Sequence, residues 1–136
     1  MLKILVAYDG SDEAKRSLDW VARFGGGEVT ATVIGVAPTL AGSERIVDSV
    51  DPTVEREELR GQLREAAETL RDAGVVAEAV ERAGNPAEMI IETAEAGNYD
   101  LVVVGTQGRH AIKRFLFGST ADRVARYAPC PVLLVR

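Results

Sequence analysis

The sequence contains very little cysteine, histidine or aromatic side chain. One of its 136 residues is cysteine, one is histidine, and aromatic residues make up 5%. The single cysteine, Cys130, cannot form an internal disulfide, and His110 has no cysteine or carboxylate motif beside it. The composition therefore predicts neither a disulfide scaffold nor a metal centre built on these two residues.

Long apolar runs and an excess of positive charge are also missing. No run approaches the ~20 apolar residues of a membrane-spanning helix, and the apolar run 4–8 between Lys3 and Asp9 is too short for a signal peptide. The net charge of -5 argues against general nucleic-acid binding, which needs clustered Lys and Arg. We therefore expect a cytoplasmic protein with no membrane contact, forming one domain over residues 1–136.

Short apolar runs alternate with helical patterns along the chain, which is typical of a parallel α/β fold. Strands are expected at about residues 2–8, 28–36, 75–82, 100–104 and 131–135. Helices are expected after the cap Ser11, from Asp51-Pro52 to Gly74, after Asn85-Pro86, and at 121–127. The first of these helices carries Trp20, which we expect to lie partly in the core. Residues 37–50 show no clear pattern.

The most informative segment follows the apolar run 101–104. Gly105 and Gly108 are followed by nine further residues and then by Gly118 and Ser119. The charged residues between positions 101 and 121 are all cationic: Arg109, Lys113 and Arg114. Glycine lets the backbone approach a ligand closely, and a helix that begins just after Gly118 would direct unpaired N–H groups at an anion. The segment predicts a phosphate-binding loop, with a connection that binds nothing as the alternative.

Ser119 has two possible roles. The run Ser119-Thr120-Ala121-Asp122 resembles a capping box with Asp in place of Glu, in which Ser119 would cap the last helix. A serine at the start of a helix could equally bind a phosphate there, and the two roles are compatible.

The spacing of Gly105, Gly108, Gly118 and Ser119 resembles the signature of nucleotide-binding universal stress proteins, which is Gly, two residues, Gly, nine residues, Gly, then Ser or Thr. The resemblance runs nearly end to end, including residues 4–11 and 128–136. It implies a Rossmann-like (adenine nucleotide alpha hydrolase-like) α/β fold, with a five-stranded parallel sheet of order 3-2-1-4-5 and helices on both faces. This order would place the reversal between the first and fourth strands, where such sheets bind ligands.

The resemblance also implies a site for ATP, with Mg²⁺ as the usual companion of a triphosphate. Asp9 matches an aspartate that contacts the nucleoside, although Asp-Gly-Ser is also a common turn. Val36 matches a position whose backbone meets the adenine edge, and the residue before it, often histidine in relatives, is Gly35. The expected nucleotide-binding residues are Ala7, Tyr8, Asp9, Val36, Val104, Gly105, Thr106, Gly108, Arg109, Gly118, Ser119 and Thr120. We expect no catalytic residue and no metal bound by the protein itself.

The last strand, Val132-Leu133-Leu134-Val135, carries no charge and should lie at a sheet edge. Free N–H and C=O groups on an apolar edge favour pairing with another chain, so we expect a homodimer through this strand, as the resemblance also implies.

The expected function is that of an ATP-binding universal stress protein acting in the stress response, through nucleotide-dependent conformation or partner binding. One alternative is a slow ATP hydrolase or phosphotransferase, for which Asp9 is the nearby acidic residue. Another is a dimeric interaction module that works without nucleotide.

Overall fold

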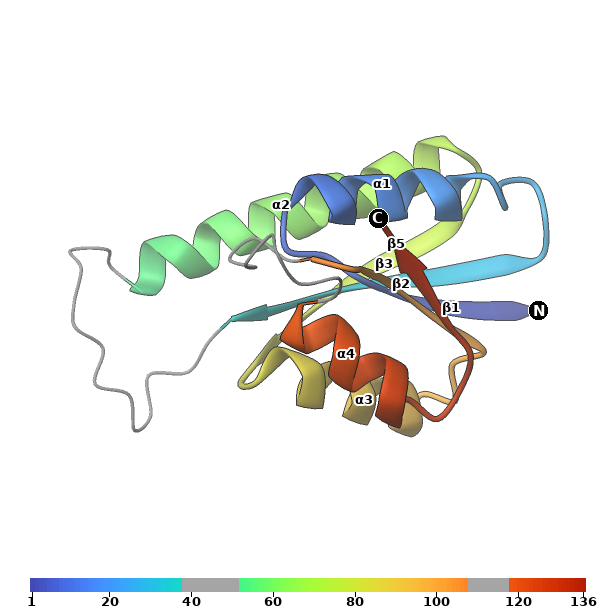
Figure 1. The fold of residues 1–136 in the computed structure, drawn as a ribbon. Helices are drawn as coiled ribbons and strands as arrows, with labels where there is room; N and C mark the ends of the chain where they lie inside the picture. The colour runs from blue at the N-terminus through green and yellow to red at the C-terminus, as the bar shows by residue number, and fades with distance from the viewer. Residues whose placement is uncertain (38–51, 108–117) are drawn as a thin grey trace.

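The computed structural model describes residues 1–37, 52–107 and 118–136, and its strands form a five-stranded parallel sheet (Figure 1). The elements are β1 (Leu2–Ala7), α1 (Asp12–Ala22), β2 (Val29–Ala37), α2 (Pro52–Asp72), β3 (Val76–Ala83), α3 (Pro86–Ala96), β4 (Leu101–Gly105), α4 (Ser119–Tyr127) and β5 (Val132–Val135). The order across the sheet is β3-β2-β1-β4-β5, and every neighbouring pair is parallel. The predicted Rossmann-like order 3-2-1-4-5 is confirmed.

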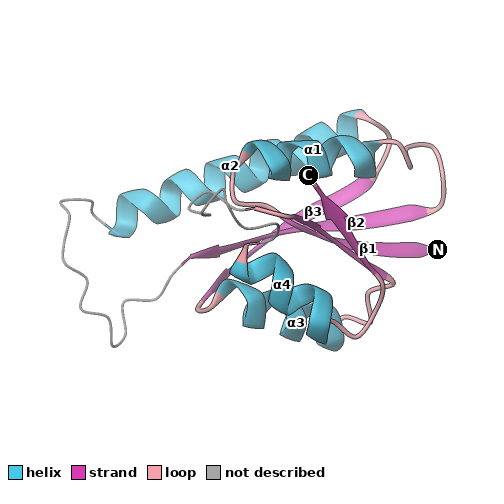
Figure 2. Cartoon of the chain, viewed as in Figure 1, coloured by secondary structure: helices cyan, strands magenta, loops and turns pink. Residues whose placement is uncertain are grey.

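Helices cover both faces of the sheet (Figure 2). Helices α1 and α2 lie on one face, and α3 and α4 lie on the other. Successive strand residues point to opposite faces, so Val33 packs in the cluster beneath α1 and α2 while Ile34 packs in the cluster of α3 and α4. Because both faces are covered, β4 can bury an uninterrupted apolar run, as the sequence pattern of residues 101–104 predicted.

The apolar stripe predicted for the second helix is the face that α2 buries. Leu63, Ala66, Ala67 and Leu70 are buried, and Leu59 packs against the same cluster. Leu70 is fully buried, and removing a leucine side chain from water stabilises a fold by about 1.5–3 kcal/mol.

Two predicted helix starts are confirmed. The Ser11 hydroxyl accepts a hydrogen bond from the Ala14 N–H at 3.1 Å and caps α1. The Asn85 side chain accepts from the Glu88 N–H at 3.0 Å and caps α3, whose first residue is Pro86. The cap predicted at Asp51 lies outside the described residues, as do residues 38–50.

Two expectations about the helices were wrong. Trp20 is 44% exposed, because α1 buries Ala14, Ser17, Leu18 and Val21 on its other side. The Arg23 guanidinium lies 4.1 Å from the centre of the Trp20 ring and covers part of it. The last helix begins at Ser119 rather than at Ala121. Across the described ranges, no helix is long and apolar enough to span a membrane.

Candidate functional site

The sheet reverses its winding between β1 and β4. These strands are neighbours, and the helices that follow them lie on opposite faces: α1 follows β1 onto one face, and α4 follows β4 onto the other (Figure 1). In parallel α/β sheets, the carboxyl ends of the strands at such a reversal are where ligands bind. We call this place the switch point, and three chain segments reach it: Tyr8 to Ser11, the end of β2, and the residues on either side of the gap 108–117.

A hydrogen bond joins Thr106 and Gly118, which lie on either side of residues 108–117 in the sequence. The Gly118 N–H donates to the carbonyl oxygen of Thr106 at 2.6 Å. Thr106 is 5% exposed, and its own N–H donates to the Val135 carbonyl at 2.8 Å. The first turn of α4 is therefore held at the carboxyl end of β4, beside the switch point.

The alternative that Ser119 caps the last helix does not hold, because the N-cap of α4 is Gly118. The Asp122 N–H donates to the Gly118 carbonyl at 3.0 Å, and the N-cap makes no side-chain hydrogen bond to the helix. Ser119 is the first helical residue and is exposed. The N–H groups of the first helical turn have no acceptor within the helix, so together with the Ser119 hydroxyl they form a set of donors suited to an anion.

An acidic side chain also lies in this turn. The Asp122 carboxylate accepts from the Arg126 Nε at 3.1 Å, one helical turn later. This pair is largely exposed, so its attraction is weak. It still offsets part of the repulsion that Asp122 would exert on an anion at the helix start.

Gly105 is required by packing. A Cβ at this position would lie 2.7 Å from the Glu13 Cβ, at the first turn of α1. Such a contact is too short for any side chain, so only glycine lets α1 approach the end of β4 this closely. The sequence suggested ligand contact as the reason for this glycine, and the structure adds a helix–strand contact that also requires it.

The segment after β1 is a tight turn. The Asp9 carboxylate accepts from the Ser11 N–H at 2.9 Å, and Gly10 has φ +81°, a conformation that favours glycine. The turn role considered for Asp9 is therefore present in the structure. Asp9 is half-buried, and because it follows β1, which runs parallel to β4, it lies at the same end of the sheet as Gly105.

Tyr8 packs into the core beside this turn. Its N–H donates to the Ile34 carbonyl at 2.9 Å, and its side chain is 9% exposed in the cluster beneath α1 and α2. Burial raises the pKa of the Tyr8 phenol, and the negative charges of Glu65 and Asp9 raise it further. The phenol is therefore neutral near pH 7.

The end of β2 presents main-chain groups to the switch point. The last pair between β1 and β2 is Ala7 with Ile34, whereas β2 continues to Ala37. The Ile34 carbonyl faces β1, since it accepts from Tyr8. Residues two apart in a strand direct their N–H and C=O groups to the same side, so those of Val36 point past the end of β1.

The main-chain groups of Val104 and Gly105 point to opposite sides of β4. The N–H groups of Val102 and Thr106 donate to carbonyls of Pro131 and Val135, so alternate residues of β4 face β5. Val104 is among them and is 4% exposed, whereas the main-chain groups of Gly105 are directed to the β1 side. Ala7 is half-buried in the cluster of α3 and α4.

The structure thus brings most of the predicted residues to one end of the sheet. Gly108 and Arg109 lie outside the described residues, as do His110, Lys113 and Arg114. Gln62 of α2 had not been predicted to lie there. Its Oε1 is 3.0 Å from where a Cβ of Gly10 would lie, so its amide borders the turn after β1. No motif marks Gln62, because its helix follows a segment without a recognisable pattern.

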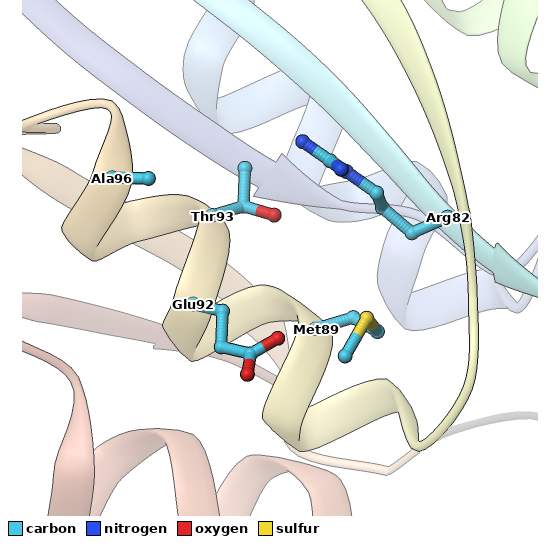
Figure 3. A pocket seen from close by; sticks show the side chains of 5 residues that line it. All are labelled: Arg82, Met89, Glu92, Thr93 and Ala96. Atoms are coloured by element: carbon cyan, nitrogen blue, oxygen red, sulfur yellow. The ribbon is translucent and has the colours of Figure 1, made fainter.

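Two surface hollows border α3. One, of about 130 Å³, lies between the end of β3 and α3, where the Arg82 side chain extends towards Thr93 (Figure 3). The other is bordered by Asn98, Tyr99 and Pro129 at the far end of α3. Within the described ranges, no group of three His, Cys, Asp or Glu residues could hold a metal ion.

The chain is similar to known proteins over its whole length. The profile of the universal stress protein family matches residues 1–136. Universal stress protein YxiE of Bacillus subtilis is 31% identical over 146 aligned residues, covering 98% of this chain and 98% of the relative. A universal stress protein of Thermus aquaticus, from the 3' region of a QAH/OAS sulfhydrylase gene, is 37% identical and covers 98% and 97%.

Solved structures show the same architecture. A universal stress protein in complex with cAMP has a TM-score of 0.76 and 26% identity, covering 99% of this chain and 97% of that one. The universal stress protein of Archaeoglobus fulgidus in complex with dAMP has a TM-score of 0.72 and 26% identity, covering 100% and 98%. The similarity therefore extends over the whole fold rather than over one motif.

Proposed function

This chain belongs to the universal stress protein family, and on that premise we propose that it binds an adenine nucleotide at the switch point, with ATP as the physiological ligand. The observation that carries the proposal is the hydrogen bond from Gly118 to Thr106, which holds the donor-rich first turn of α4 beside the end of β4. The solved relatives that contain cAMP and dAMP support an adenine nucleotide as the class of ligand.

The phosphates occupy the α4 side of the site in this proposal. The Ser119 hydroxyl is exposed and is not used as a cap, and the first-turn N–H groups around Thr120 point the same way. Hydrogen bonds from such groups to an anion are stronger than those between neutral partners. Gly108 and Arg109 complete the phosphate contacts, as the spacing of the glycines predicts.

The nucleoside occupies the β1 and β2 side. The main-chain N–H and C=O of Val36 point past β1, and this donor–acceptor pair matches the edge of adenine that carries N1 and the 6-amino group. The Asp9 carboxylate would be repelled by a triphosphate, so it belongs at the ribose. Gly105 faces the same space, while Ala7, Tyr8, Val104 and Thr106 support the site through packing and main-chain bonds.

The cation in this proposal comes with the nucleotide. Hydroxyl and amide donors fit phosphate oxygens, but the described residues offer no cluster of carboxylates for a divalent ion. Mg²⁺ commonly keeps several waters and binds through substrate phosphates. We therefore assign Mg²⁺ to the triphosphate rather than to a site built by the protein.

The dimer is the second part of the proposal. β5 lies at the edge of the sheet, carries no charge, and has three of its four residues only half-buried. The other edge, β3, carries Glu78, Glu81 and Arg82, which discourage pairing between chains. We propose that β5 pairs with its counterpart in a cytoplasmic homodimer of one-domain chains. Bound nucleotide would then alter the conformation or partner contacts of the protein during stress.

The test is calorimetric titration of ATP, ADP, AMP and cAMP into nucleotide-free protein, with and without Mg²⁺. Mass spectrometry of small molecules released from the purified protein identifies the ligand carried from the cell. We expect saturable binding of ATP that Mg²⁺ strengthens, and an adenine nucleotide in the released fraction. Absence of binding by all four nucleotides overturns the proposal.

A further inference from the structure

The carboxyl end of β5 is bound from two directions. The Val135 carbonyl accepts from the Thr106 N–H at 2.8 Å, and the Arg136 carbonyl accepts from the Arg16 Nε at 2.6 Å. Thr106 follows β4, and Arg16 belongs to α1. The end of the edge strand is therefore tied to both elements that border the switch point.

The first of these ties continues directly to the proposed phosphate site. The Thr106 N–H donates to the Val135 carbonyl, and the Thr106 carbonyl accepts from the N–H of Gly118, the N-cap of α4. Thr106 is buried and cannot replace either partner with water. A shift of Val135 must therefore move the first turn of α4 or break one of the two hydrogen bonds.

The second tie reaches the same place through α1. Arg16 lies 3.9 Å from the Glu13 carboxylate, and the Glu13 Cβ packs against Gly105 at the end of β4. The position of Arg136 thus depends on the first turn of α1, and the first turn of α1 depends on Gly105. Two separate series of contacts, one from Val135 and one from the next residue, Arg136, therefore connect the end of β5 to the switch point.

β5 itself is held on one side only in the described sheet. It has four residues and pairs with β4. The carbonyls of Pro131 and Val135 point towards β4 and accept hydrogen bonds from the N–H groups of Val102 and Thr106. The N–H and C=O groups of Val132 and Leu134 consequently point to the open edge. A short strand with one neighbour opens locally at a small cost in free energy.

We propose that pairing of this edge with a second copy of the chain increases the affinity for the nucleotide, because it fixes β5 and, through Thr106, the first turn of α4. A two-fold axis at Leu133 would pair Val132 with Leu134 of the second copy. This coupling rests on the proposed function, and it makes dimer formation a regulator of nucleotide binding. Linkage requires that the nucleotide strengthen self-association by the same factor.

The experiment measures both halves of this linkage in the full chain. Analytical ultracentrifugation gives the dimer dissociation constant with and without Mg·ATP. The dissociation constant for Mg·ATP is then measured at protein concentrations below and above the dimer dissociation constant. We expect the dimer to bind about tenfold more tightly than the monomer, within the usual range of coupling between sites. We also expect Mg·ATP to lower the dimer dissociation constant by that same factor.

Two substitutions at one position separate edge pairing from side-chain loss. Leu134→Pro removes the N–H that faces the open edge and keeps the β4 ladder, because Leu134 does not donate to β4. Leu134→Ala removes the same side chain and keeps the N–H. We expect Leu134→Pro to stay monomeric at higher concentration and to bind Mg·ATP about tenfold more weakly than Leu134→Ala.

The outcomes are distinguishable. Equal affinity of monomer and dimer in the unmodified chain overturns the coupling, as does a monomer at every concentration, and either result leaves nucleotide binding intact. Failure of the unmodified chain to bind any adenine nucleotide overturns the proposed function, and the coupling with it. The measurements on the unmodified chain decide the matter even where Leu134→Pro does not fold.

Discussion

Gly118 donates its N–H to the carbonyl oxygen of Thr106 across 2.6 Å, and this one contact joins two residues that are twelve positions apart in the sequence. It sets where α4 begins, because Gly118 is also the N-cap of that helix. It leaves the Ser119 side chain free of the capping role that its sequence context suggested. The start of α4 is therefore positioned by main-chain groups, and its side chains remain available to a ligand.

The first prediction concerns Gly118→Val. Gly118 has φ -71°, which any residue can adopt, so the backbone tolerates the change. The added side chain would occupy space next to the first-turn N–H groups of α4. We expect affinity for Mg·ATP to fall at least about tenfold, the loss of one hydrogen bond to a charged group, as measured by calorimetry.

Gly61→Ala is the matched control. Gly61 lies within α2, and a Cβ there meets no atom within 4 Å. Alanine in a helix is favoured over glycine by roughly 0.5–1 kcal/mol, so this variant should be slightly more stable and bind normally. Gly118→Val that binds as tightly as Gly61→Ala would show that phosphate does not approach Gly118.

The second prediction concerns the Ser119 hydroxyl. Because it caps no helix, Ser119→Ala should leave the free energy of unfolding within about 0.5 kcal/mol of the original value. The same change should weaken Mg·ATP binding about tenfold if the hydroxyl donates to a phosphate oxygen. Ser11→Ala is the contrasting variant, since Ser11 does cap α1, and it should cost about 1 kcal/mol in urea denaturation. A loss of stability in Ser119→Ala equal to that of Ser11→Ala contradicts the assignment.

The third prediction separates packing from binding at Gly105. A Cβ there would lie 2.7 Å from the Glu13 Cβ, so Gly105→Ala must push α1 away from β4. Overpacking of this kind costs about 1–3 kcal/mol, which urea denaturation without nucleotide would detect. An alanine variant as stable as the original protein would mean that α1 shifts at no cost.

Much of the fold could be predicted because its signals are local. Ser11 and Asn85 belong to the residue types that favour helix caps, and the structure confirms both as caps. The apolar stripe from Leu59 to Leu70 has the spacing of one helix face. The sheet order has no such local signal. It came from the resemblance to a family, which rests on the glycine spacing together with residues 4–11 and 128–136 at the two ends.

The site could be predicted in part, and its errors have a common cause. Ser119 reads as a cap in sequence, but whether a helix starts one residue earlier depends on the tertiary bond from Gly118 to Thr106. Gly105 is expected from its spacing to face a ligand, and spacing gives no sign that packing against Glu13, far away in the chain, also requires glycine there. Gln62 reaches Gly10 from another helix. Each depends on contacts between distant segments, which spacing alone does not encode.

The fourth prediction concerns alkaline pH and Tyr8. Burial, with Glu65 and Asp9 nearby, raises the pKa of the Tyr8 phenol above its ordinary value of about 10. In the folded protein this group keeps its proton to higher pH than in the unfolded chain. The folded state is therefore favoured while Tyr8 is neutral, and stability falls as pH rises above about 10 towards the raised pKa. Tyr8→Phe removes the ionisable group, so part of this alkaline loss should disappear.

The measurement is urea denaturation of each variant at pH 8 and at pH 11. Tyr127→Phe is the control, since Tyr127 is 63% exposed and lies far from Tyr8 on α4. The drop in unfolding free energy between the two pH values should be smaller for Tyr8→Phe than for Tyr127→Phe. An equal drop in the two variants would place the alkaline sensitivity in other groups, such as the Cys130 thiol, whose pKa is raised by burial and by Asp100.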